Sequence, residues 1–263
     1  PDIIHLHSSK AGAIGRMAFN GKIPMFYTPH GYSFLMENYK PIKRRLFKLI
    51  ESVCAKRKCT TISCSIGEHQ KSLKLTKNAI YVNNGINMAE LQEIIDKTEK
   101  VNHPFTVYTL GRICYQKNPT LFNEIASSLP DVKFIWIGDG ELRKELTSKN
   151  IEITGWSDRT TAIKYSVNAD AFLLTSRWEG LPISLLESMY MKKVCVVSNV
   201  IGNRDVIHTG ENGFVCSCTD EYVHAIRSAQ SNNTDTITES AYDDIVYLYN
   251  TKKMAEQYKK IYG

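Results

Sequence analysis

Two glutamates frame the stretch of the chain that is best suited to bind a ligand. Glu179 and Glu187 lie eight residues apart within residues 176–187, which follow an apolar run typical of a strand. Gly180 lets the backbone approach a ligand closely, and Pro182 is expected as the first residue of a helix, where its missing N–H would lack a partner anyway. The N–H groups at the start of this helix would then favour an anion such as phosphate.

The two glutamates allow more than one chemistry. A glycosidase uses a pair of carboxyl groups that flank one bond at about 5–9 Å, but a loop and a helix between Glu179 and Glu187 do not set that distance. A carboxylate can also accept hydrogen bonds from two hydroxyls, so one glutamate could hold a ribose and the other a sugar. Taken alone, they could equally be an exposed loop acid and an ordinary helix acid.

Two further loops at expected strand ends could complete a site for a nucleotide. Residues 111–118 place Arg112 and Lys117 between a strand and a helix, where the two cations could neutralise a diphosphate and stabilise it as a leaving group. Residues 138–142 begin with Gly-Asp-Gly, but Arg143 stands where the dinucleotide fingerprint needs glycine, which argues against an NAD enzyme. Taken alone, the cations could be solvated and the glycines could form a turn without a ligand.

The elements that position these loops alternate between strands and helices, which predicts an α/β fold with two doubly wound parallel sheets. We expect strands at 3–7, 24–28, 60–65, 79–83, 105–110, 132–137, 151–154, 171–175, 194–198 and 213–215. Helices are expected at 9–17, 40–58, 67–75, 119–129, 140–148, 159–166, 182–192, 221–228 and 237–262, with a polar helix and connection over 88–104. These elements predict an amino-terminal domain (1–100), a second domain (101–236) and a helical tail (237–263) that crosses back to the first domain.

The formal net charge of +6 comes from the first part of the chain. Residues 1–100 hold 16 Lys and Arg against 8 Asp and Glu. Most of the excess lies in residues 40–58, where Glu51 is the single acid and apolar residues recur at helical spacing. Such a basic amphipathic helix can lie on an anionic membrane surface, or it can be the solvated side of a helix that packs on an ordinary core. No nucleic-acid-binding motif accompanies it, so nucleic acid is not expected as a partner.

The composition argues against several other classes of protein. A hydrophobic content of 43% and a charged content of 23% are typical of a soluble globular protein, and no run of eighteen apolar residues occurs. The seven cysteines form no Cys-x-x-Cys pair, which indicates neither a disulfide framework nor a zinc site and fits a reducing cytoplasm. No Asp-x-Asp occurs, so no metal is expected. His5 and His7 share one side of a strand, where a structural role is favoured over metal binding.

In order and spacing, the motifs of residues 105–218 resemble those of glycosyltransferase family 4, whose members are retaining enzymes of the GT-B fold. The matching residues are Gly111-Arg112, Lys117-Asn118, Gly138-Asp139-Gly140, Thr154-Gly155-Trp156, the stretch from Ser176 to Glu187, Gly202-Asn203-Arg204-Asp205 and Asn212-Gly213-Phe214. Residues 2–8, 28–31 and 82–87 are also similar. The chain departs from the family at Asp205, where glutamate is more usual, and it lacks the strand–helix section with which members begin, so the amino-terminal domain is expected to be incomplete.

The resemblance implies a role for each motif residue. Arg112 and Lys117, with Gly111, would bind the donor diphosphate, and Glu187 would bind the ribose. Glu179 and the backbone of Gly180 and Leu181 would hold the transferred sugar. The base pocket would be formed by Gly138, Gly140, Leu142, Gly155 and Trp156. His30, across the cleft in the other domain, would lie near the anomeric carbon and the acceptor.

The resemblance also implies a reaction. The enzyme would move a sugar, with retention, from a nucleotide diphosphate sugar to a glycan or lipid-linked acceptor in capsule or lipopolysaccharide synthesis. We expect a UDP-sugar first and a GDP-sugar second, with no cofactor. The protein would be cytoplasmic, either free or held at the inner face of the membrane by the helix at 40–58. The alternative is a nucleotide-sugar binding protein that lacks transfer activity because its first domain is incomplete.

Overall fold

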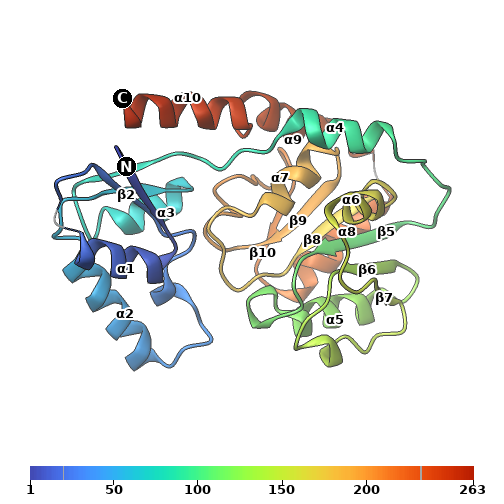
Figure 1. Cartoon of the computed structure of the whole chain (residues 1–263). Helices are drawn as coiled ribbons and strands as arrows, with labels where there is room; N and C mark the ends of the chain where they lie inside the picture. The colour runs from blue at the N-terminus through green and yellow to red at the C-terminus, as the bar shows by residue number, and fades with distance from the viewer. Residues whose placement is uncertain (20, 232) are drawn as a thin grey trace.

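The chain folds around two parallel β-sheets. The computed structural model describes residues 1–19, 21–231 and 233–263. One sheet has four strands in the order β1-β2-β3-β4, and the other has six in the order β10-β9-β8-β5-β6-β7. Figure 1 shows each sheet with its own helices as a separate domain, and the last helix lies over the first of them. The predicted α/β fold with two parallel sheets is confirmed.

The first sheet places its functional loops along one edge. Its strands are β1 (Ile4–His7), β2 (Met25–Thr28), β3 (Thr60–Ser63) and β4 (Ala79–Tyr81), and its helices are α1 (Ser9–Ala18), η1 (a 3-10 helix, Ser33–Leu35), α2 (Pro41–Cys54) and α3 (Ile66–Ser72). The register pairs His7 with Thr28, the last residues of β1 and β2. The turn that contains His30 therefore lies at the carboxyl ends of the strands, close to His7.

The second sheet has strands β5 (Thr106–Leu110), β6 (Lys133–Ile137), β7 (Ile151–Ile153), β8 (Ala171–Leu174), β9 (Val194–Ser198) and β10 (Phe214–Cys216). Its helices are α4 (Met88–Asp96), α5 (Pro119–Ser128), α6 (Arg159–Val167), α7 (Ile183–Tyr190), α8 (Thr219–Ser231) and α9 (Asp235–Tyr247). The strand β5 pairs with both β6 and β8, so the strand order reverses there. Ligands of open α/β sheets bind at the carboxyl ends of strands at such a point.

The core of the second domain has two parts, one on each side of its sheet. Along β8, Phe172 joins the buried cluster that includes Leu185 and Met189 of α7, whereas Leu173 joins the cluster that includes Phe122 of α5. This alternation follows from the two-residue repeat of a strand. Because both faces are covered, the strands are almost continuously apolar, which made them predictable from the sequence.

Three expectations about helices are wrong. The helix expected at 140–148 is only a 3-10 helix, η3 (Arg143–Glu145), because the N–H of Leu142 bonds to the carbonyl of Ile113 in another loop. The tail is not one helix but two, α9 and α10 (Thr251–Tyr262), because the side chain of Asn250 caps a new helix at that point. Pro182 is the cap residue before α7 and not its first helical residue.

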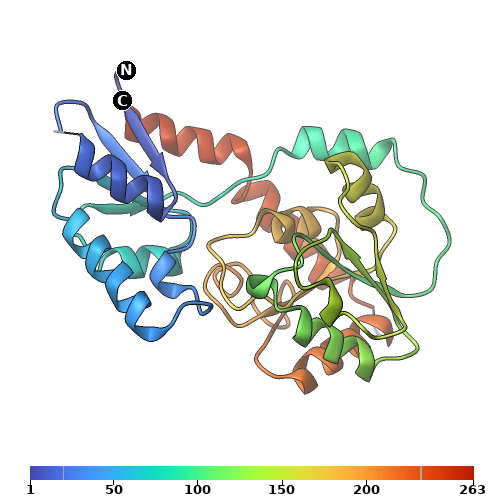
Figure 2. The same ribbon diagram turned by 60° about the horizontal axis from the view of Figure 1, so that its bottom comes forward.

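The chain crosses between the two domains twice, and the two crossings lie side by side. The first crossing leads from β4 to α4. Because Leu91 of α4 is fully buried in the core of the second domain, this crossing comes earlier in the chain than the boundary expected near residue 100. The N–H of Ile86 bonds to the carbonyl of Tyr249, and the N–H of Thr251 bonds to the carbonyl of Ile86. The returning helix α10 then packs on the first sheet, which brings both termini to one end of the molecule (Figure 2).

None of the helices in the described part of the chain has the length and apolar composition needed to cross a bilayer.

Candidate active site

The loops that follow β5 and β6 pack closely against each other, because glycines stand where they meet. Gly138 has a left-handed φ of 136°, and a Cβ atom on it would lie 2.3 Å from the carbonyl oxygen of Gly111. A Cβ on Gly140 would lie 2.2 Å from the carbonyl oxygen of Ile113. A side chain at either position would thus collide with the backbone of the neighbouring loop. The predicted donor-binding residues Gly111, Gly138 and Gly140 are brought together, and the reason is loop packing.

The loops that follow β5 and β8 are joined by a charged pair. The Nζ of Lys117 lies 2.7 Å from Oε1 of Glu179, whose side chain is only 8% exposed. Gln116 donates to the other carboxylate oxygen of Glu179 and to the carbonyl of Trp178. The cation predicted for the diphosphate therefore contacts the acid predicted for the sugar. An incoming anionic group could draw Lys117 from Glu179 and leave that carboxylate free to accept hydroxyls.

Arg112 has a different partner. Its Nε donates to Glu141 in the loop after β6 at 3.0 Å, and its side chain is 65% exposed. An exposed pair of this kind contributes little to stability, so the guanidinium can exchange Glu141 for an anion at small cost. Arg112 and Lys117 thus come from one loop but pair with acids of two different neighbouring loops, the loop after β6 and the loop after β8.

Glu187 is buried beneath the start of a neighbouring helix. Its side chain is 3% exposed, and its Oε1 lies 2.6 Å from Arg159 at the first position of α6. Arg159 also donates to Glu90 of α4 at 2.8 Å. Burial raises the pKa of Glu187, and the bond to Arg159 opposes that rise. The sequence analysis missed Arg159, because an arginine at the start of a polar helix carries no signal of this contact.

The residues predicted for the base pocket lie partly in the open. Trp156 is 70% exposed, so the face of its indole is available for stacking. Gly155 has a left-handed φ of 77° and forms a bridge with Gly138, which ties the loop after β7 to the loop after β6. Leu142 differs from these residues, because it is partly buried against the core. The structure therefore brings Gly138 and Gly155 together and leaves the indole outside this contact.

His30 lies in a tight turn at the edge of the first sheet. Its backbone φ of 52° is left-handed. Residues other than glycine rarely adopt this conformation, and where they do they often lie at a functional site. Its Nε2 lies 2.9 Å from Nδ1 of His7, and the two rings stack. Burial, and then His7, lower the pKa of His30. His30 is thereby favoured in its neutral form, which can accept a proton at one ring nitrogen.

A buried acid holds the turn of His30 in place. Glu68 of α3 accepts a hydrogen bond from the N–H of Gly31 at 2.6 Å and another from the N–H of Cys64 at 2.8 Å. Burial raises the pKa of Glu68, and these two bonds oppose the rise. The sequence analysis missed Glu68, although Ser65 and Glu68 have the Ser-x-x-Glu spacing of a helix start. The structure shows half of that motif, in which Ser65 accepts from the N–H of Glu68.

The two halves of the site touch across the domain boundary. A Cβ atom on Gly180 would lie 3.1 Å from the nitrogen of Gly31, and the carbonyl of Leu181 accepts a hydrogen bond from Asn84 at 2.8 Å. Asp205, the residue that departs from the family pattern, accepts from the N–H of Gly67 at 2.9 Å. The loop that carries Glu179, Gly180 and Leu181 is thus brought directly to the His30 turn.

Comparisons with known proteins agree with this arrangement. Residues 90–245 match the family described as "Glycosyl transferases group 1". The chain is 29% identical to the "UDP-Gal:alpha-D-GlcNAc-diphosphoundecaprenol alpha-1,3-galactosyltransferase" of Escherichia coli, over 99% of this chain and 75% of that protein.

Solved structures share the fold at low sequence identity. Sucrose-phosphate synthase from Thermosynechococcus elongatus has a TM-score of 0.84 at 15% identity and covers 99% of this chain and 73% of its own. Alr3699/HepE of Anabaena, solved in complex with UDP and glucose, has a TM-score of 0.82 at 16% identity over 99% of this chain and 77% of its own. The two sheets, the loops at their facing edges and the matched family together show that the chain belongs to the group 1 glycosyltransferases and has their GT-B fold.

Proposed function

We propose that the protein is a retaining glycosyltransferase of family 4 that moves a sugar from a UDP-sugar to a lipid-linked or glycan acceptor. The observation that carries this proposal is the contact between the two domains at Gly180 and Gly31. It brings the loop of Glu179, which is paired with Lys117, directly to the His30 turn. A group held by this pair would thus face the imidazole, as transfer between a donor and an acceptor requires.

In the proposed complex each donor group has its own set of residues. The diphosphate takes Lys117 from Glu179 and Arg112 from Glu141, and it lies against the backbone of Gly111. The ribose hydroxyls bond to Glu187, and the freed Glu179 and the backbone of Gly180 and Leu181 hold the sugar. The base lies against the loops of Gly138, Gly140, Leu142 and Gly155, with Trp156 as a stacking surface.

The proposed chemistry needs no protein nucleophile. The acceptor hydroxyl attacks the anomeric carbon from the face on which the diphosphate leaves, and the bond from that carbon to the phosphate oxygen breaks with its electron pair going to the diphosphate. The acceptor proton passes to a phosphate oxygen. Because the new bond forms on the face from which the diphosphate leaves, the configuration at the anomeric carbon is retained. Lys117 and Arg112 stabilise the developing negative charge, and we propose that neither a metal ion nor a cofactor is required.

The proposed setting is the inner face of the cytoplasmic membrane, during synthesis of a surface polysaccharide. The E. coli relative is named for a sugar on diphosphoundecaprenol. Helix α2 leaves Ile42, Leu46 and Leu49 exposed beside its basic residues, which suits a helix that lies on an anionic bilayer. Nucleic acid is not proposed as a partner.

A transfer assay tests this function. The purified chain is incubated with UDP-, GDP- and ADP-sugars and with N-acetylglucosamine on a prenyl diphosphate, and products are identified by mass spectrometry and by the proton NMR signal of the anomeric position. We expect transfer from a UDP-sugar, with retention, that persists in EDTA. An inverted product, or loss of transfer in EDTA, would contradict the mechanism. Donor binding with no turnover would support the non-catalytic alternative, which the relatives, named as transferases, do not favour.

A further inference from the structure

A cavity lies in the first domain, between α2, η1 and α3. It has a volume of about 380 Å³, which is within the range of small-ligand sites. Its wall combines apolar and basic side chains and contains no acid. The lining residues are Phe34, Leu35, Pro41, Arg44, Arg45, Lys48, Lys71, Lys74 and Leu75.

The five cations of this cavity have no acidic partners. Among the ion pairs of the described residues, none involves Arg44, Arg45, Lys48, Lys71 or Lys74. Arg44 is held at the wall, because its Nε donates to the carbonyl of Phe34 at 3.0 Å. Cations that converge from two helices on one cavity favour an anion with several oxygens, and the fork of an arginine fits phosphate.

Helix α2 divides its residues among three faces. Phe47, Glu51 and Cys54 point to the core, and Pro41, Arg44, Arg45 and Lys48 line the cavity. The third face is apolar and exposed, which is unusual because a helix normally buries its apolar stripe. It consists of Ile42, Leu46, Leu49, Ile50 and Val53. Helix α1, which lies beside α2 in Figure 1, also has exposed apolar residues, Ile14 and Met17.

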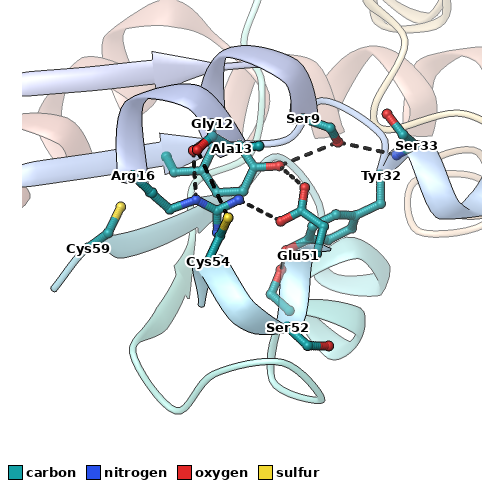
Figure 3. Close-up of polar contacts among 12 residues, drawn as sticks. Ser9, Gly12, Ala13, Arg16, Tyr32, Ser33, Glu51, Ser52, Cys54 and Cys59 are labelled. Atoms are coloured by element: carbon teal, nitrogen blue, oxygen red, sulfur yellow. Dashed lines mark hydrogen bonds and ion pairs between the residues drawn. The ribbon is translucent and has the colours of Figure 1, made fainter. Parts of the chain in front are cut away.

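A buried ion pair fixes this orientation of α2. Arg16 of α1 lies 2.6 Å from Glu51 of α2, and both are almost fully buried. Glu51 also accepts from the hydroxyl of Tyr27 in β2, and Arg16 donates to the carbonyl of Gly12. Figure 3 shows Arg16 and Glu51 pointing toward each other between the two helices. Rotation of α2 would break this pair in a buried setting, so the basic and apolar faces stay turned outward.

We infer that the cavity binds the diphosphate of a lipid-linked acceptor, with the lipid chain against the exposed apolar face of α2. This inference rests on the proposed transferase function and names its acceptor class. The cavity shares its elements with the His30 turn, because η1 begins three residues after His30 and Lys71 follows Glu68 by about 5 Å of helix rise on α3. A sugar attached to the bound diphosphate would therefore extend from the cavity toward His30.

Paired charge removals test the site. One variant changes the α3 wall (Lys71→Gln with Lys74→Gln) and another changes the α2 wall (Arg45→Gln with Lys48→Gln). The matched control, Lys56→Gln with Arg57→Gln, removes the same charge from exposed positions that do not line this cavity. Each protein is given N-acetylglucosamine on a prenyl diphosphate and, separately, on an uncharged octyl group. We expect both wall variants to raise KM for the diphosphate acceptor about tenfold or more, with less than about a twofold change for the octyl acceptor and for the control.

A binding measurement separates this inference from the proposed function. Isothermal titration with geranyl diphosphate should give about tenfold weaker binding in both wall variants and unchanged binding in the control. If binding behaves so but no donor is turned over, the proposed function fails and the site stands. Equal losses for both acceptors, or an equal loss in the control, would overturn the site. So would wall variants that lose binding to phosphatidylglycerol vesicles but keep geranyl diphosphate, because the cations would then serve a general membrane surface.

Discussion

Gly180 of the second domain lies against Gly31 of the first, so closely that a Cβ atom on Gly180 would come within 3.1 Å of the Gly31 nitrogen. The same atom would lie 3.0 Å from Sγ of Cys64. A side chain on Gly180 would therefore require these atoms of the first domain to give way by a few tenths of an ångström, whereas Gly31 is constrained by its left-handed φ of 90°. The close fit between the loop of Gly180 and the His30 turn depends on the absence of a side chain at Gly180.

The first prediction concerns this contact. Gly180→Ala should lower kcat/KM several-fold, because the new Cβ would lie only 3.0 Å from Sγ of Cys64 and 3.1 Å from the Gly31 nitrogen, and the two loops would have to shift by a few tenths of an ångström. The free energy of unfolding should change little, since each domain keeps its own core. Steady-state kinetics and urea unfolding of the same preparations measure the two effects. An unchanged kcat/KM would show that the domains do not need this contact during the reaction.

The second prediction concerns the charged pair of Lys117 and Glu179. Lys117→Met should lower kcat/KM about 10²–10³-fold, because it removes a cation that we propose for the leaving diphosphate and leaves the buried Glu179 without its cationic partner. Lys133→Met, which removes the partner of Glu152 in an exposed pair, is the matched control and should lose less than about twofold. The affinity for UDP, measured by isothermal titration calorimetry, should fall in the Lys117→Met variant only. Equal behaviour of the two variants would remove Lys117 from the diphosphate role.

The third prediction concerns the acid proposed to hold the ribose. Arg159 opposes the rise that burial causes in the pKa of Glu187, so Arg159→Gln should raise that pKa further. Only the ionised carboxylate accepts from both ribose hydroxyls, so UDP affinity in the variant should fall more steeply than in the wild type as the pH is lowered from 8 to 6. Arg227→Gln, which removes an exposed ion pair with Asp131, is the control. Glu187→Ala should weaken UDP binding at every pH, and unchanged affinity in that variant would exclude the ribose role.

The fourth prediction concerns the histidines of the first sheet. Burial, and then His7 and His30, lower the pKa of His5 from 6.5 to about 4, and Tyr262 and Thr28 bond to its ring. Between these pH values the unfolded chain binds more protons than the folded one, so stability is lost as the pH falls from 6.5 toward 4. From pH 7 to pH 5 this histidine should cost about 1–2 kcal/mol of the free energy of unfolding.

Urea unfolding of the wild type and of His5→Gln at the two pH values measures this loss. The variant should start less stable at pH 7, because it loses packing against Phe26 and Tyr258, and it should then lose less on acidification. The same pH dependence in both proteins would show that His5 does not control it.

Local sequence predicted the parts of the fold that depend on local interactions. Apolar runs such as residues 132–137 and 194–198 indicated the strands, because a parallel strand covered on both faces is apolar along its length. The helix expected at 140–148 was wrong because Ile113, nearly thirty residues away, accepts the N–H of Leu142. The contact between Arg159 and Glu187 could not be predicted for a similar reason, since it depends on the order of β7 and β8 in the sheet. Roles for Gly138 and Gly140 were expected from the ligand, and the structure adds a reason from loop packing.

The two crossings between the domains, bonded to each other at Ile86, Tyr249 and Thr251, have a mechanical consequence. A single connecting segment leaves the relative rotation of two domains almost unrestricted. Two parallel segments joined by hydrogen bonds restrict that rotation to fewer directions. Relative rotation of the domains would have to strain both segments and break the bonds of Asn84 to Leu181 and of Gly67 to Asp205. The two crossings therefore limit how far the loop of Glu179 and the His30 turn can move relative to each other.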